Sequence, residues 1–301
     1  MHLHKHTAWV LCAALITAAD AGASAERAVV INDQRLYREA RLESGSVGRI
    51  TVGEEVSVTG RQGALLLVAL PGNRVGWTLA NGLVILDANP RAAALLYDAA
   101  DTIAQEDTAE AWRAAERLFR KAAALSQGGP YAPEALWRAA ELSLRAELRR
   151  RGPVMPMDAI EELSALVRSY PKTAVAARAT FLLLRESLCD YWDGTPGCPE
   201  TEIGLISTYL EQFPDSERTG ELRHALAYRH AALVEIYLQP GTAHFSAEKA
   251  MEHKAKARAA VDALLRQQGG TIWAARGERL VWSLEHNVGV FSGIEVALRR
   301  F

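Results

Sequence analysis

Short runs of apolar residues alternate with glycine-rich turns between residues 26 and 88. Five runs rich in branched or aliphatic side chains stand at residues 28–31, 47–52, 56–59, 64–70 and 74–78. A turn signal recurs about every 8–12 residues, which is typical of all-β domains. Short strands at this spacing favour a small sheet that closes on itself. The pattern therefore predicts a small β-barrel in this part of the chain.

The hydrophobic period changes to that of a helix at Asn89. Asn89 is a suitable N-cap, and Pro90 suits the first helical position. Residues 107–110, 158–161 and 292–295 have the spacing of a capping box and predict further helix starts. The first is followed by an apolar stripe at Trp112, Ala115, Leu118, Phe119, Ala122 and Ala123. We therefore expect residues 89–301 to be almost entirely helical.

A short turn sequence recurs inside the helical part. Residues 169–174 read SYPKTA and residues 212–217 read QFPDSE, and each lies between two amphipathic segments. Proline ends the first helix of each pair because it cannot continue a helix. Thr173 and Ser216 are placed to cap the second helix.

The repeat extends over most of the helical part. Pro130, Pro171 and Pro214 stand at intervals of 41 and 43 residues, and residues 247–267 and 272–286 form a further predicted pair. One helix pair cannot bury its apolar face alone, so successive pairs stack. The fold class expected is α+β and mostly α, with a barrel over residues 26–88 and an α-helical hairpin repeat, a solenoid, over residues 89–301.

Residues 1–25 have the organisation of a signal peptide. Lys5 precedes an apolar run at residues 8–19, and Ala23-Ser24-Ala25 has the small residues that signal peptidase accepts. The run is too short to span a bilayer, and no later stretch is long and apolar enough to do so. We expect cleavage after Ala25 and a periplasmic or secreted mature protein.

Two cysteines remain after the predicted cleavage, Cys189 and Cys198. Export places them in an oxidising compartment, where a pair nine residues apart closes a disulfide across a turn-rich loop. The alternative is a redox or nucleophilic cysteine, but a CxxC spacing and a nearby histidine are both missing. We predict a structural disulfide.

Residues 46–58 and 72–78 carry the pattern of a known family. They read SVGRITVGEEVSV and GNRVGWT, with Gly53 and the Gly76-Trp77 pair at the family's offsets. Residues 27–86 thus resemble the bacterial SH3 domains of envelope and cell-wall proteins, which implies an SH3-like barrel. Leu65 stands where the family has its first tryptophan. The resemblance leaves two roles for Trp77, a core residue or a ligand contact.

The aromatic-Pro-x-Thr/Ser turns also resemble a family. Residues 107–287 are similar to the tetratricopeptide-like (TPR-like) repeats of bacterial envelope proteins, although the interval exceeds the usual length of about 34 residues. This resemblance implies stacked helix pairs that bind a protein partner.

Composition and charge narrow the function. Hydrophobic residues are 49% and charged residues 23% of the chain, so it has enough apolar side chains to build cores. The net charge of −2 gives no electrostatic footprint for nucleic acid.

The sequence contains no recognisable catalytic constellation. It has no G-x-S-x-G elbow, phosphate loop or dinucleotide fingerprint. The histidines that follow the signal peptide lack the spacing of metal ligands, so surface or helix-stabilising roles are favoured over a metal site; they are His224, His230, His244, His253 and His286. No catalytic residue, cofactor or metal is predicted.

The candidate contact residues are Trp77, Tyr191 and Trp192. The last two lie in the predicted disulfide loop, and packing and partner contact are both open for Trp192. The leading hypothesis is a non-catalytic exported envelope adaptor, or scaffold, that binds an envelope protein through its helical repeats. The alternative is a peptidoglycan-binding module that uses the SH3-like domain. A third hypothesis is an accessory subunit of a hydrolase.

Overall fold

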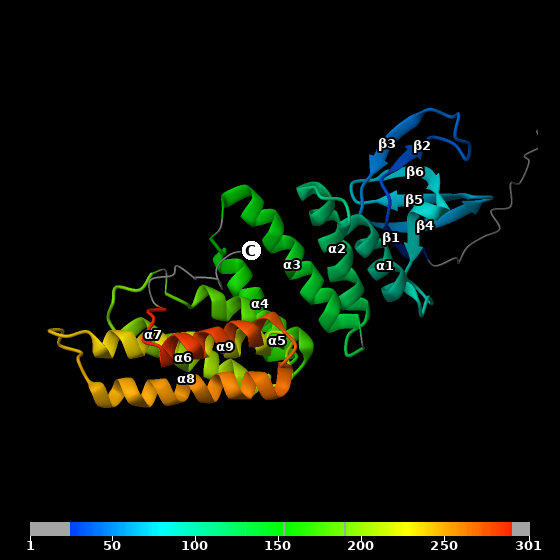
Figure 1. Cartoon of the computed structure of the whole chain (residues 1–301). Helices are drawn as coiled ribbons and strands as arrows, with labels where there is room; N and C mark the ends of the chain where they lie inside the picture. Colours follow the sequence, from blue (N-terminus) through cyan, green and yellow to red (C-terminus); the bar gives the residue numbers. More distant parts are fainter. Residues whose placement is uncertain (1–24, 130, 153, 190, 291–301) are drawn as a thin grey trace, which may run out of the picture. The chain divides into compact units, whose positions relative to one another are not determined.

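The protein consists of a β-sheet unit and a helical unit (Figure 1). The computed structural model describes residues 25–129, 131–152, 154–189 and 191–290. The two compact units are Met1–Ala92 and Ala93–Phe301. The fold is α+β with a majority of helix, as predicted. The signal peptide, apart from Ala25, and the helix predicted to start at residues 292–295 lie outside the described residues.

The described strands form one antiparallel sheet in the order β3-β2-β6-β5-β4-β1-β7. Their bounds are β1 Glu26–Val30, β2 Gln34–Tyr37, β3 Ser46–Ile50, β4 Glu55–Gln62, β5 Leu65–Leu70, β6 Arg74–Leu79 and β7 Leu83–Ile85. The five predicted runs coincide with β1, β3, β4, β5 and β6, while the short β2 and β7 were not among them. The prediction that this sheet closes into a barrel over residues 26–88 is wrong for the described residues, since no described pairing joins the edge strands β3 and β7.

One face of the sheet carries the core of the first unit. Along β5 the side chains alternate, so that Leu66, Val68 and Leu70 are buried while Leu67 and Ala69 are half-buried. Gly76 lies close to Leu36 on the buried side. A Cβ atom at Gly76 would stand 2.9 Å from the Cβ of Leu36, so glycine is required there. The buried core residues are Ala28, Val30, Leu36, Ile50, Val56, Val58, Leu66, Val68, Leu70 and Leu83.

The second unit is a succession of helices joined by short loops (Figure 1). The described helices are α1 Ala92–Ala104, α2 Ala109–Leu125, α3 Tyr131–Arg151, α4 Met157–Ser169, α5 Ala174–Glu186, α6 Gly197–Gln212, α7 Thr219–Leu238, α8 Ala247–Gln268 and α9 Ile272–Glu285. Neighbours in sequence pack on one another, as in the pairs α2–α3, α4–α5, α6–α7 and α8–α9. Within the described residues, no helix is long and apolar enough to cross a membrane.

Two threonines cap helices, and the turn sequence predicts the first of them, Thr173. The Thr173 hydroxyl accepts from the Ala176 backbone N–H at 3.1 Å, and Thr271 does the same for Ala274 at 3.3 Å. Each hydroxyl satisfies a backbone donor that the first turn of a helix leaves without an intrahelical acceptor.

Three predicted caps are wrong. The cap of α2 is Thr108 rather than Asp107, whose carboxylate instead meets Arg149 at 3.2 Å. Asp158 lies inside the first turn of α4, where its negative charge interacts favourably with the helix dipole but does not cap the helix. Ser216 lies before Arg218, the N-cap of α7, and bonds to the backbone N–H of Arg218 and to the Tyr209 hydroxyl.

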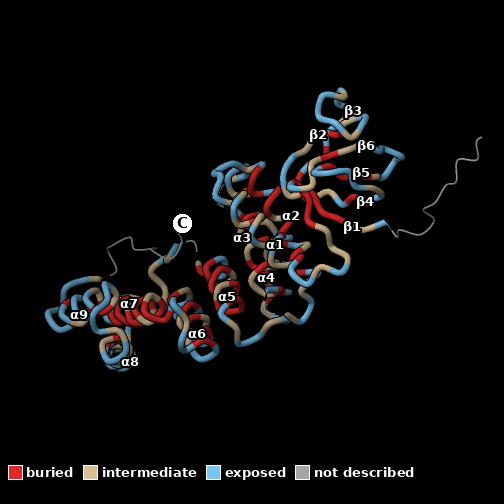
Figure 2. The backbone as a smooth tube through the Cα atoms, turned by 90° about the vertical axis from the view of Figure 1, so that its right-hand side faces the viewer, coloured by how far each residue is buried: buried red, intermediate tan, exposed pale blue. Residues whose placement is uncertain are grey.

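Helix α7 is the most deeply enclosed helix of the described chain, and Figure 2 shows it buried along most of its length. Leu222 and Ala225 pack against α5 and α6 in one core cluster. Leu233 and Ile236 pack against α8 and α9 in another. Because α7 has apolar residues on more than one side, neighbouring helices cover it on more than one side.

A disulfide and a buried carboxylate fix the segment between α5 and α6. The predicted Cys189–Cys198 bond is confirmed, with Cα atoms 6.1 Å apart. Glu202, 2% exposed, accepts from the Cys189 backbone N–H at 2.9 Å, from Trp192 Nε1 at 3.2 Å and from Arg229 Nε at 2.8 Å. Burial lowers the pKa of Arg229, and the Glu202 carboxylate opposes that shift. One carboxylate therefore joins the disulfide loop to α7.

Replacing Glu202 with alanine is expected to destabilise the protein by about 3–5 kcal/mol, because it leaves the Arg229 guanidinium buried without its carboxylate. Urea unfolding measures the loss. The control is Glu252→Ala, whose ion pair with Lys256 has both side chains at least half exposed, so its loss should leave the stability nearly unchanged. Equal losses in the two variants would contradict this account of the loop.

Candidate functional site

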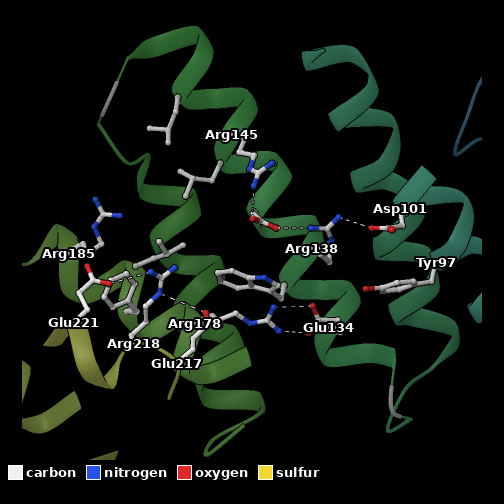
Figure 3. A pocket seen from close by; sticks show the side chains of 16 residues that line it. Tyr97, Asp101, Glu134, Arg138, Arg145, Arg178, Arg185, Glu217, Arg218 and Glu221 are labelled. Carbon is white, nitrogen blue, oxygen red and sulfur yellow. Dashed lines mark hydrogen bonds and ion pairs between the residues drawn. The ribbon is translucent and has the colours of Figure 1, made fainter. Parts of the chain in front are cut away.

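A concave site of the helical unit is a cavity of about 890 Å³, here called the groove (Figure 3). Alternate helices supply its walls, namely α1, α3, α5 and the start of α7. The lining residues are Tyr97, Asp101, Glu134, Trp137, Arg138, Glu141, Leu144, Arg145, Leu148, Arg178, Phe181, Leu182, Arg185, Glu217, Arg218 and Glu221. All of them belong to the second unit.

Arginines recur in the groove at a constant interval. The step along the chain from Arg138 on α3 to Arg178 on α5 equals the step from Arg178 to Arg218 at the start of α7. The same interval separates Arg145 from Arg185. Equivalent positions of the alternate helices α3, α5 and α7 therefore line the same cavity, as expected when helix pairs stack in register.

Two of the arginines join a groove helix to the groove helix before it. Arg138 donates to Asp101 on α1 at 2.7 Å, and Arg178 donates to both carboxylate oxygens of Glu134 on α3 (Figure 3). A two-point contact of this kind fixes the guanidinium plane as well as its position. Each groove carboxylate lies within 4.0 Å of an arginine nitrogen.

Aromatic rings lie beneath several of these arginines. The guanidinium carbon of Arg178 stands 5.0 Å from the ring centre of Trp137, and that of Arg218 stands 4.8 Å from Phe181. Cations at these distances are attracted to the faces of aromatic rings. The groove thus offers flat apolar surface, guanidinium donors and carboxylate acceptors side by side.

These groups suit binding more than proton transfer. Guanidinium groups stay protonated in proteins and act as donors only. Burial raises the pKa of the Tyr97 hydroxyl, aided by the nearby Glu134 carboxylate, so this group is neutral at ordinary pH. Within the described residues there is no group of three or more His, Cys, Asp or Glu that would hold a metal ion.

The residues predicted as contacts lie elsewhere. Tyr191 is 75% exposed in the disulfide loop, whereas Trp192 is half-buried and stacks on Tyr228 with ring centres 5.9 Å apart. Neither lines the groove. The contacts of Trp192 agree with a packing role, the first of the two roles left open above.

Trp77 lies in the middle of a row of half-buried residues on the sheet. It pairs with Tyr37 on β2 and with Leu67 on β5, so the three side chains share one face. It is not among the buried residues of the sheet core. The indole is therefore partly accessible on the face opposite the core.

The constant interval of the groove arginines was missed in the sequence, although it was readable there. The intervals between the prolines of the turns are 41 and 43 residues, because the loops differ in length. This variation obscured the constant interval of the arginines. An alignment of the sequence with itself that pairs Arg138 with Arg178 also pairs Arg178 with Arg218.

Two histidines that are distant in sequence meet where α7 packs on α8. The Nδ1 atoms of His230 and His253 are 2.9 Å apart, and the Tyr237 ring stacks on His253. Burial lowers the pKa of His230 to about 4, with further contributions from His253 and Lys256. Burial and Lys256 also lower the pKa of His253, while Glu252 and Glu200 oppose the shift. The pair is therefore neutral at pH 7.

No protein-family model matches the chain, and no curated protein matches it.

Acidification is expected to weaken the contact between α7 and α8. The pKa of His230 in the folded protein lies below the ordinary value of about 6.5, so the unfolded chain binds protons first. The stabilisation from the neutral pair is complete above about pH 6.5 and declines as the pH falls toward 4. Denaturant midpoints measured across this range should fall more steeply for the natural chain than for the double variant His230→Asn, His253→Asn. A His244→Asn control, changed in an exposed loop, should follow the natural profile, and identical slopes in all three proteins would contradict the assignment.

Proposed function

We propose that this protein is a non-catalytic exported envelope adaptor that binds a segment of a protein partner in the groove. The observation that carries this proposal is the groove itself, in which equivalent residues of α3, α5 and α7 recur at one constant interval. A surface built by repetition along stacked helices suits an extended polypeptide, which presents its own side chains at regular intervals. The helical unit is accordingly a TPR-like repeat.

The mixture of groups in the groove supports a polypeptide partner. Tryptophan, tyrosine and arginine are the residues that contribute most to protein interfaces. Here Tyr97, Trp137 and Arg178 lie together, with Glu134 between the tyrosine and the arginine in Figure 3. Both signs of charge are present in equal number, five arginines and five carboxylates, so selectivity comes from the arrangement of charges and not from a net field.

Export and the sheet unit complete the proposal. The disulfide supports an oxidising location, in agreement with the predicted signal peptide. The sheet unit is SH3-like in this proposal, on the strength of the motif around Gly76 and Trp77. The second candidate function is peptidoglycan binding by this unit, favoured by the partly accessible row of Tyr37, Trp77 and Leu67.

Photo-crosslinking in the native envelope tests the adaptor function. A photoreactive amino acid at Arg145, which is exposed in the groove, is expected to form a covalent adduct with one envelope protein. The control is the same group at Met251, which is 71% exposed on α8 and lies outside the groove. Adducts of equal yield from both positions, or from Met251 alone, contradict binding in the groove.

Sedimentation with purified peptidoglycan separates the two candidate functions. As an adaptor, the protein should stay in the supernatant. Retention by the wall that Trp77→Ala removes, while Leu42→Ala at an exposed site of the same unit leaves it intact, would instead establish the second candidate. Circular dichroism of both variants checks that each keeps its fold.

A further inference from the structure

One position of the groove breaks the pattern of its equivalents. Residues 141, 181 and 221 follow one another at the same interval as the arginines and read Glu, Phe and Glu. On α3, Glu141 lies between Arg138 and Arg145 and bonds to both, at 3.2 and 2.9 Å. On α7, Glu221 lies 3.3 Å from Arg218.

Helix α5 keeps both arginines of this pattern but not the carboxylate. Arg178 and Arg185 precede and follow Phe181 by three and four residues, the same offsets that Arg138 and Arg145 have from Glu141. Arg178 reaches Glu134 on the preceding groove helix instead. At this level of the groove, the chain supplies a phenyl ring where its neighbours supply an acceptor.

Two guanidinium groups lie around that ring. The guanidinium carbons of Arg218 and Arg185 stand 4.8 and 5.9 Å from the centre of the Phe181 ring. Arg185 is 8% exposed, and burial lowers its pKa, while the carboxylates of Glu221 and Glu186 oppose the shift. A further carboxylate here would be attracted by two cations over a weakly hydrated aromatic surface.

We propose that Phe181, Arg185 and Arg218 form a carboxylate subsite of the groove, which takes an acidic group from the bound partner segment at the level where α3 carries its own Glu141. This inference rests on the proposed function and names the chemistry of the partner, a polypeptide with a carboxylate beside apolar side chains. The group that yields is Glu217, which is exposed and lies 3.8 Å from Arg218. Trp137 and Leu144, on the same cavity, receive the apolar neighbours of the acidic residue.

Selection of random dodecapeptides displayed on phage against the purified full chain tests this subsite. Peptides that crosslink to the photoreactive group at Arg145 are expected to share one aspartate, glutamate or C-terminal carboxylate. Replacing that acidic side chain with its amide, or amidating the C-terminus, should weaken binding about tenfold or more, since a charge-assisted hydrogen bond is lost. The two replacements identify which source supplies the carboxylate.

Protein variants locate the contact. Arg185→Gln and Arg218→Gln should each weaken binding of the acidic peptide about tenfold. Binding of its amide form should be nearly unaffected, as expected if the peptide carboxylate and the arginine interact directly. Arg258→Gln is the matched control, because its guanidinium bonds to Glu285 outside the groove, and it should leave the affinity for the peptide nearly unchanged. Circular dichroism confirms that the variants fold, and the peptide replacements need no protein variant.

The outcomes separate this inference from the function on which it rests. Peptides that crosslink in the groove without a shared carboxylate, or that ignore both Arg185→Gln and Arg218→Gln, overturn the subsite and leave the adaptor function standing. Recovery of no peptide that crosslinks in the groove counts against the adaptor function, and the subsite falls with it.

Discussion

Each amphipathic helix of the second unit needs other helices to cover its apolar side, and this constraint organises the unit. Helix α7 shows it most clearly, since Leu222 faces one core cluster and Leu233 faces another. A helix with two apolar sides has to lie between neighbours. The burial of these side chains from water supplies the driving force for stacking.

The groove follows from the same stacking. When pairs of helices pack in succession, one helix of each pair faces the same side, here α1, α3, α5 and α7. Part of that side packs in the core, and part of it stays accessible and carries polar chemistry, as at Arg138, Arg145 and Arg218. Ion pairs of Arg138 and Arg178 link α3 to α1 and α5 to α3.

Buried and accessible charges serve different purposes in this molecule. Glu202 and Arg229 are both buried, so removing either leaves a costly charge in the interior. The ion pairs of the groove are different, because Arg138, Arg145 and Arg218 keep between 27% and 54% of their side-chain surface exposed. Accessible pairs contribute little to stability. Their donors remain within reach of a partner, which is why the groove is suited to recognition.

The helices and strands could be predicted from the sequence better than the contacts between them. Five strands, most helices, the Thr173 cap and the disulfide follow from local signals, such as alternation, turn residues and a cysteine pair in an exported chain. Errors of one or two residues occurred where several polar residues adjoin a helix start, as at Asp107 and Thr108, since either side chain has the chemistry of a cap.

Contacts between distant residues were beyond local signals. The His230–His253 pair depends on the crossing of α7 and α8, and the acceptor role of Glu202 depends on three segments meeting. The pairing of Arg178 with Glu134 likewise spans 44 residues. Such contacts are set by the packing of whole helices, which the spacing of apolar residues does not specify. The shared position of the groove arginines is different, because their constant interval can be read in the sequence.

That interval makes the length of the groove adjustable. Adding or deleting one block of this length at a loop would extend or shorten the groove by one level while preserving the order of arginines elsewhere, because stacked helix pairs contact mainly their neighbours. The length of the groove can therefore change by duplication or loss of a block, without redesigning the levels that remain.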